Sequence, residues 1–250
     1  MRPEAYELLA NRQETYWWHR ARRALAVSLL QNAGVPEGCR WIDLGCGPGG
    51  NLHLLDKLHP MEVVGVDVST IALSIAERRV PGVKLVRADL NETLPFGAAT
   101  FDVATIFNVL YHDWIASEGR VLSEAARILR KDGMLLLTEP AFPELRRQLD
   151  DVVMTRRRYH LHDFAEMLEN RGFEPLFGSY FTSFGVPIVL ATKLFRRLRP
   201  TPDAVAPEMQ PLHATVNEAL FGAAMVEAWL ITRGTRMPVG TTLIYVAKRR

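Results

Sequence analysis

Residues 41–52 read WIDLGCGPGGNL, a run that passes from apolar residues into four glycines within six positions. Glycine loses more backbone entropy on folding than any other residue, so such a cluster is best explained by a sharp turn whose backbone must approach another group closely. The apolar residues before the turn predict a buried strand, and the residues after it predict a helix. The run therefore predicts a strand, a glycine turn and a helix built around a nucleotide-like ligand.

The spacing of these glycines is compatible with two kinds of nucleotide site. Gly45, Gly47 and Gly50 fit the G-x-G-x-x-G of a dinucleotide-binding fold. Taking Gly49 instead of Gly50 gives a tighter G-x-G-x-G. Asp43 discriminates better than the spacing, since a carboxylate beside the turn would repel a pyrophosphate and would suit a cationic group. A glycine turn that serves only packing is the remaining interpretation.

Length and composition bound the class of protein. At 250 residues the chain can bury one sizeable core, so we expect one domain with appendages. A formal net charge of +2 gives no argument for a nucleic-acid partner. Cys39 and Cys46 form no disulfide framework, and the N-terminal residues lack the apolar core of a signal peptide. We therefore expect a cytoplasmic protein that is soluble or at most peripheral to a membrane.

Predicted strands alternate with predicted helices along the chain. Besides the strand before the glycine turn, strands are expected at 62–67, 83–87, 101–107, 134–139, 174–182 and 241–247. Helices are expected at about 3–33, 51–58, 117–129, 163–171 and 212–232, with a further one starting near 69 and a Pro-rich linker around 200–207. This alternation predicts an α/β fold with a doubly wound, parallel sheet and right-handed crossovers.

Two further acids follow predicted strands. Asp67 closes the second strand, where an acidic side chain accepts hydrogen bonds from both ribose hydroxyls of a bound nucleotide. Its alternative role is to cap the following helix. Asp89, after the third strand, can accept the exocyclic amine of adenine, with Leu90 against the ring face. Ligands of open α/β sheets collect at the carboxyl ends of strands, so these residues should lie near the glycine turn.

The order of these signals from 40 to 140 is similar to the core of the class I S-adenosylmethionine-dependent methyltransferases. The signals are Asp43 with Gly45, Gly47 and Gly49, then Asp67, Asp89, Phe101-Asp102 and Leu129-x-x-x-Gly133. The resemblance implies a seven-stranded, mostly parallel, Rossmann-like sheet whose last strand inserts antiparallel between two others. It also implies S-adenosylmethionine as the cofactor, held by Asp43, Gly45, Cys46, Gly47, Gly49, Asp67, Val68, Asp89, Leu90 and Asn108.

The flanks resemble one branch of this family, with an aromatic and basic lid before the core and Arg157-Arg158-Tyr159 after it. In the lid, Trp18 and Arg22 are expected to close over the cofactor, the guanidinium pairing with its carboxylate. The alternative is a lid whose aromatics pack on the core and whose arginines are solvated. The implied organisation is a helical lid at 1–34, a cofactor-binding core at 35–182 with 241–250, and a helical insertion or cap at 183–240.

Methyl transfer from a sulfonium mainly requires an acceptor aligned with the methyl carbon. We expect a small-molecule acceptor methylated at oxygen, with His112 as the general base for a hydroxyl and Tyr111 as the second candidate. The alternative for His112 is a helix-capping or adenosine-adjacent residue. Arg157, Arg158 and Tyr159 are expected to hold an anionic acceptor, which would need no base, and their alternative is a solvated basic turn. No metal is expected.

The same residues are compatible with two other functions. An NAD(P)-dependent oxidoreductase would use Gly45, Gly47 and Gly50, with Asp67 on the ribose. A non-catalytic, methyltransferase-like partner protein would keep the fold for assembly. The segment at 184–198 is apolar and then basic, so we expect it to cover the substrate pocket or a homodimer seam, or to lie on a membrane surface.

Overall fold

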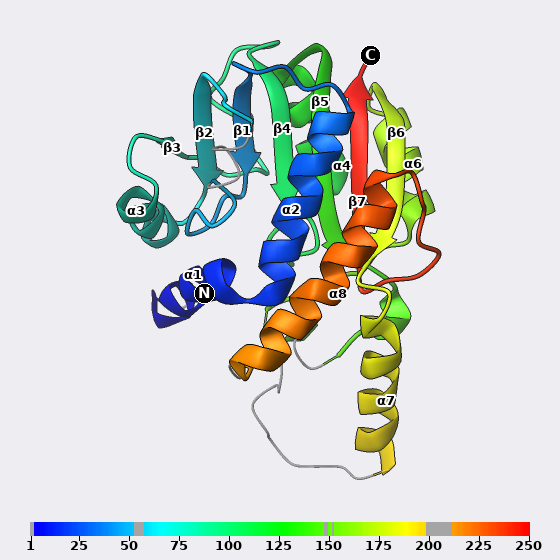
Figure 1. The fold of residues 1–250 in the computed structure, drawn as a ribbon. Helices are drawn as coiled ribbons and strands as arrows, with labels where there is room; N and C mark the ends of the chain where they lie inside the picture. Colours follow the sequence, from blue (N-terminus) through cyan, green and yellow to red (C-terminus); the bar gives the residue numbers. More distant parts are fainter. Residues whose placement is uncertain (1–2, 53–57, 148–149, 152, 199–211) are drawn as a thin grey trace.

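The computed structural model describes residues 3–52, 58–147, 150–151, 153–198 and 212–250. The described residues form a seven-stranded sheet in the order β3-β2-β1-β4-β5-β7-β6, with helices on both faces (Figure 1). The strands are β1 (Arg40–Leu44), β2 (Glu62–Asp67), β3 (Lys84–Arg87), β4 (Phe101–Phe107), β5 (Leu129–Pro140), β6 (Phe173–Phe181) and β7 (Thr242–Arg249). The expected helix at 51–58 and the Pro-rich linker lie for the most part outside the described residues.

Strand β7 runs against the direction of the sheet. It lies antiparallel between β5 and β6, with Leu137 of β5 opposite Tyr245 and Ser179 of β6 opposite Ile244. The pairs formed by β1 to β5 are parallel. The predicted α/β fold, with one antiparallel strand inserted near the end of a parallel sheet, is confirmed.

The helices form layers on the two faces of this sheet. They are α1 (Pro3–Thr15), α2 (Trp17–Asn32), α3 (Thr70–Arg79), α4 (Glu118–Ile128), α6 (Leu161–Glu169), α7 (Gly185–Leu198) and α8 (Ala214–Thr232), with a 3-10 turn η2 (Pro143–Leu145). Serine side chains start two of them, because Ser69 and Ser117 accept the free backbone N–H groups in the first turns of α3 and α4. Helices α2 and α8 lie side by side across one face (Figure 1).

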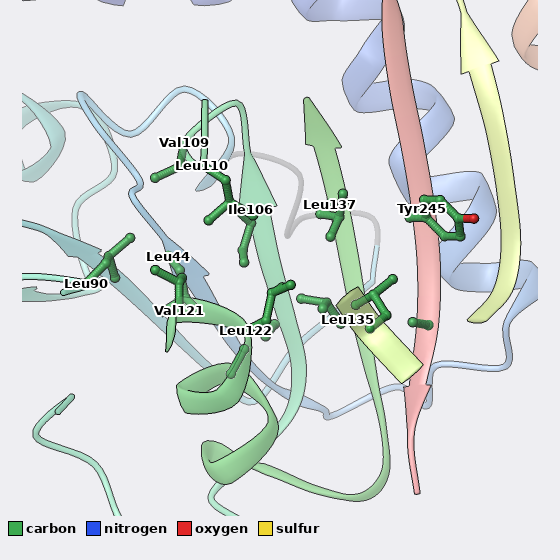
Figure 2. Packing of buried hydrophobic residues seen from close by; sticks show 14 of the residues in the cluster. Leu44, Leu90, Ile106, Val109, Leu110, Val121, Leu122, Leu135, Leu137 and Tyr245 are labelled. Atoms are coloured by element: carbon green, nitrogen blue, oxygen red, sulfur yellow. The ribbon is translucent and has the colours of Figure 1, made fainter. Parts of the chain in front are cut away.

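Side chains of the central strands alternate between two hydrophobic clusters, because successive residues of a strand point to opposite faces. In β1, Ile42 and Leu44 belong to one cluster, whereas Trp41 belongs to the other. Figure 2 shows the first cluster, in which Val121 and Leu122 of α4 pack against the sheet. The sheet is therefore buried on both faces, as the apolar strands predict.

The N-terminal segment forms two helices instead of the single helix expected at 3–33. Tyr16 is extended, with φ −75° and ψ 130°, and separates α1 from α2. The next backbone N–H, that of Trp17, donates to Asn217 Oδ1 of α8 at 2.9 Å. Strand β5 also begins earlier than expected, at Leu129, because this residue pairs with the start of β4. Both differences arise from contacts between segments far apart in the sequence.

Helix α8 has the length and mean hydropathy of a membrane-spanning helix, and it alone among the described helices meets both criteria. Helices in the core of soluble proteins meet them too. Ala224, Ala228 and Ile231 of α8 are buried in the second cluster. Glu227 accepts three hydrogen bonds from the N–H and hydroxyl of Ser183, each 3.0 Å long. Helix α8 is thus part of the layer that covers the sheet.

Candidate active site

The glycine turn after β1 has a backbone that glycine adopts most readily. Gly45, Gly47 and Gly49 have φ values of +79°, +53° and +86°, in the left-handed region. A Cβ on Gly45 would lie 2.5 Å from Val109 Cγ2, whereas no described atom outside the adjoining residues lies within 4 Å of a Cβ on Gly47. Close packing therefore explains the glycine at position 45. Gly47 faces open space.

Asp43, near the carboxyl end of β1, is buried with only 1% of its surface exposed. Trp41 Nε1 donates to Thr105 Oγ1 at 2.9 Å, and the Thr105 hydroxyl donates to Asp43 Oδ1 at 2.7 Å. This relay fixes the carboxylate and leaves Oδ2 buried without a hydrogen-bond partner among the described residues. Burial raises the pKa of Asp43 to about 7. A cation bound at Oδ2 would favour the charged form.

Arg22 of α2 is buried to a similar degree, with 2% exposed. Its Nη1 donates to Asn108 Oδ1 at 2.5 Å and its Nη2 to Asn51 Oδ1 at 2.9 Å. The guanidinium lies over the rings of Trp18 and Phe107, 4.6 and 4.9 Å from their centroids. Its Nε is buried and has no partner in the described part of the chain. Burial lowers the pKa of Arg22 to about 9, so the group stays cationic at neutral pH.

Asp43 and Arg22 together leave one buried acceptor and one buried donor without a partner in the part of the chain that the structure describes. The two groups lie close enough for each to affect the pKa of the other. A buried polar group without a partner costs about 1–3 kcal/mol. An α-amino acid group would satisfy both, with its ammonium at the carboxylate and its carboxylate at the guanidinium. These residues therefore fit the amino-acid end of a ligand beside the glycine turn.

Asp67, at the end of β2, binds the backbone of the glycine turn. Its Oδ2 accepts the N–H of Gly47 at 2.9 Å, and its Oδ1 accepts the N–H of Ser69 at 2.8 Å. Ser69 caps α3 with its own hydroxyl, so Asp67 is not the cap. Burial raises the pKa of Asp67. Each carboxylate oxygen has a further lone pair, with which the predicted ribose contact is compatible.

Four more residues predicted to contact the cofactor differ in their exposure. Cys46 has a buried side chain, and its N–H donates to Val66 O at 2.9 Å. Val68 and Asp89, after β2 and β3, are exposed, and Leu90 is buried in the first cluster. Asp89 Oδ1 accepts hydrogen bonds from the backbone N–H and the side-chain amide of Asn91, each 2.9 Å long. Their cofactor contacts stay predictions.

Glu139, at the end of β5, holds the backbone that follows β4. Its Oε1 accepts the N–H groups of Val109 and Leu110 at 3.1 and 2.8 Å, and its Oε2 accepts that of Tyr111 at 3.2 Å. The carboxyl group is fully buried, and burial raises its pKa to about 8. Asn108, just before this segment, has a φ of +58°. The candidate floor of the reaction site is thus fixed by a carboxylate that the sequence analysis did not identify.

His112 lies on this floor, 9% exposed. Its Nδ1 is 3.0 Å from Val153 O, so we assign the ring proton to Nδ1, which leaves a lone pair on Nε2. The ring stacks on Trp114 with centroids 3.7 Å apart and contacts Tyr111 at 3.9 Å. Burial lowers the pKa of His112 to about 4, so it is neutral at pH 7. Burial raises the pKa of Tyr111, which favours a donor over a base.

The three residues predicted to hold the acceptor all have partners within the chain. Arg158 is buried and forms two hydrogen bonds with Asp150, of 2.8 and 3.2 Å. The Tyr159 hydroxyl lies 2.9 Å from Glu118 Oε1, and Arg157 Nε lies 3.1 Å from the same oxygen. Arg158 and Tyr159 therefore anchor this segment, whereas the Arg157 side chain is 48% exposed. Their role in substrate binding stays a prediction.

The structure brings into the site several polar residues that the sequence analysis did not identify. They are Gln13, Asn51, Thr105 and Glu139. Thr105 interrupts an apolar strand and Glu139 ends one. A polar residue at such a position is a sequence signal by which both could have been identified. Gln13 carries no such signal, since its Oε1 accepts the N–H of Gly50, far along the chain, at 3.0 Å. No three His, Cys, Asp or Glu side chains of the described ranges gather as a metal site requires.

Comparison with known proteins gives a family match. Residues 42–137 match the family model described as a methyltransferase domain. The chain is 30% identical over 217 residues to an uncharacterized 37.1 kDa protein in transposon Tn4556 of Streptomyces fradiae, a match that covers 84% of this chain and 62% of that protein. It is 35% identical over 120 residues to trans-aconitate 2-methyltransferase of Azoarcus sp. (strain BH72), covering 48% of this chain and 46% of the relative.

A solved structure gives the same fold. The geranyl diphosphate methyltransferase in complex with S-adenosylmethionine superposes with a TM-score of 0.61 at 17% identity, over 93% of this chain and 87% of the other. Identity this low shows the fold alone. This chain spans less than two thirds of the length of both sequence relatives.

Proposed function

We propose that this chain, which belongs to the class I S-adenosylmethionine-dependent methyltransferases, transfers a methyl group from S-adenosylmethionine to an oxygen atom of a small-molecule acceptor. The observation that carries the proposal is a pair of buried atoms that have no hydrogen-bond partner among the described residues, Oδ2 of Asp43 and Nε of Arg22. S-adenosylmethionine ends in an α-amino carboxylate. Its methyl group is bonded to a sulfonium, which leaves as a neutral thioether when the methyl group is transferred.

The residues that bind the cofactor in this proposal come from α2, β1, the glycine turn, β2 and the segment after β3. Asp43 accepts the ammonium group and Arg22 donates to the carboxylate, so each unpaired atom gains a partner of opposite charge. Gly47, where a Cβ would have no described atom within 4 Å apart from those of the adjoining residues, gives the ligand room to approach the backbone. Asp67 accepts the ribose hydroxyls, and Leu90 contacts the adenine ring.

The properties of His112 favour a carboxylate as the acceptor. A hydroxyl loses its proton as the new C–O bond forms, and the Nε2 lone pair of His112 would take that proton. A pKa of about 4 makes this imidazole a weak base at neutral pH. A carboxylate carries no proton at pH 7, so it needs no base. The exposed part of Arg157 is the candidate partner for its charge.

The first experiment measures cofactor binding by calorimetry. We expect S-adenosylmethionine to bind the wild type, and Asp43→Asn to weaken binding at least about tenfold through loss of the ionic contact. Asp113→Asn, at an exposed carboxylate, is the control and should bind as the wild type does. Absence of binding would contradict the proposal. A larger thermal shift with NAD than with S-adenosylhomocysteine would favour an oxidoreductase.

The second experiment identifies the acceptor atom. The protein is incubated with methyl-labelled S-adenosylmethionine and a panel of small carboxylic acids and phenols. Methyl esters release labelled methanol in base, whereas methyl ethers do not, so the two products are separated chemically. With a carboxylate acceptor, His112→Asn should change kcat by less than about threefold, whereas with a hydroxyl it should lower kcat by about a hundredfold. If the cofactor binds but an extract of the host, incubated in the same way, yields no labelled product, a non-catalytic partner is favoured.

A further inference from the structure

Helix α7 stands apart from the body of the protein, beyond the edge at which β6 ends (Figure 1). Its contacts with the body include η2, where Lys193 Nζ donates to Glu144 O at 2.6 Å. Among residues 187–195, only Val189 is buried, with 5% of its surface exposed. The middle of this helix therefore lies almost wholly outside the core.

The exposed side of α7 is apolar. Ile188, Leu190 and Leu194 are 55%, 50% and 60% exposed. At about 100° per residue, Ile188 and Leu190 lie about 100° to either side of Val189 and Leu194 about 140° from it, so the three span the half of the helix surface opposite Val189. A surface helix of a soluble protein normally turns its apolar side to the core. In α7 the arrangement is reversed, which marks an interaction surface.

The charge of this segment indicates the chemistry of its partner. The sequence from 184 to 199 contains four basic residues, Lys193, Arg196, Arg197 and Arg199, and no acidic residue. A helix that combines an apolar face with basic residues binds at the surface of a bilayer with anionic lipids. A symmetric contact with a second copy would instead bring two sets of basic residues together, which costs electrostatic energy.

We propose that the outward face of α7, defined by Ile188, Leu190 and Leu194, docks on an anionic lipid surface. The apolar side chains enter the boundary between headgroups and acyl chains, and the net positive charge of the segment attracts the anionic headgroups. Because α7 follows β6 at the carboxyl edge of the sheet, docking places the edge that carries the candidate active site toward the lipid. The proposal does not depend on methyl transfer.

The test measures binding of the full chain to vesicles by co-sedimentation. Vesicles of phosphatidylglycerol and phosphatidylcholine, at about equal amounts, are compared with phosphatidylcholine alone, and we expect at least about tenfold tighter binding to the anionic vesicles. Binding should weaken as salt rises from about 0.1 M to about 0.5 M. The triple variant Ile188→Ser/Leu190→Ser/Leu194→Ser should lose at least about tenfold in binding to the anionic vesicles.

A matched variant controls for the loss of exposed apolar surface. Met61 is 73% exposed and lies at the opposite edge of the sheet, just before β2, so Met61→Ser should bind the anionic vesicles as the wild type does. Thermal unfolding of the triple variant at the wild-type temperature would show that it is folded. Equal binding to both kinds of vesicle, or full binding by the triple variant, would overturn the proposal. If the wild type forms a dimer that the triple variant does not form, and the wild type does not bind vesicles, the face is assigned to a second copy. That result would also overturn the proposal.

Discussion

Asp43→Asn should stabilise the cofactor-free protein while it weakens cofactor binding. The pKa of Asp43 is raised by burial from an ordinary value of 3.8 to about 7. Between pH 3.8 and about pH 7, the folded state therefore keeps a proton on Asp43 that the unfolded chain has already released. Since stability falls wherever the folded state binds more protons, the free energy of unfolding declines as pH rises through this window, and the full cost is present above pH 7.

The size of the effect follows from the two pKa values. At about 1.36 kcal/mol per pKa unit, the cost of ionising Asp43 grows by about 2–3 kcal/mol between about pH 5 and about pH 8. The asparagine does not titrate, so the variant should gain that amount relative to the wild type across this range. The unpaired amide of the variant costs about 1–3 kcal/mol at every pH. This cost does not depend on pH, so it cancels when the stability difference between variant and wild type is compared at two pH values.

The assay is urea unfolding of both proteins, freed of cofactor, at several pH values. Asp113→Asn controls for the loss of one charge at an exposed site. Saturating S-adenosylmethionine should stabilise the wild type more than Asp43→Asn, because binding at Asp43 favours its charged form. A stability difference that stays constant with pH would refute the reasoning, since it would mean that Asp43 is not a buried acid with a raised pKa.

Three further substitutions test the site. Arg22→Ala should raise the Kd for S-adenosylmethionine at least about tenfold, and Arg20→Ala, at a more exposed arginine, by less than about twofold in calorimetry. Gly45→Ala should lower the free energy of unfolding by about 2–4 kcal/mol through the 2.5 Å contact with Val109. Gly38→Ala, at φ +73° in open space, should cost only about 1–2 kcal/mol in the same urea assay. Glu139→Ala should cost about 3 kcal/mol or more because three backbone N–H groups lose their acceptor, and a loss under about 1 kcal/mol would contradict this.

The strands were predictable because their signal is local. Strands β2 and β4 have the expected bounds, 62–67 and 101–107, since each is an apolar run between turn residues and is buried on both faces. The break between α1 and α2 was not predictable, because the contact at the break joins Trp17 to Asn217. A helical pattern in the sequence carries no record of such a partner.

The candidate site divides in the same way. Asp43 and the glycines could be proposed from the sequence because they form one local motif, a buried strand that runs into a glycine turn. Arg22 was placed in the lid from its composition, but its two amide partners come from the glycine turn and from the end of β4. Arg158 shows the limit of composition most clearly. As one of three successive arginines it reads as a binding residue, whereas the structure buries it against Asp150.

The number of partners separates buried carboxylates that hold the fold together from one that is set to bind a ligand. Glu139 accepts three backbone N–H groups, Asp150 binds Arg158 through both oxygens, and Glu118 binds two arginines and a tyrosine. Asp43 is as deeply buried as these, yet the described residues provide a hydrogen-bond partner for only one of its oxygens. An asparagine or an apolar residue at this position would cost the fold less. The free energy lost in burying Asp43 Oδ2 is therefore best explained by a cationic group bound beside it. Nε of Arg22, which also has no partner among the described residues, favours an anionic group on the same ligand.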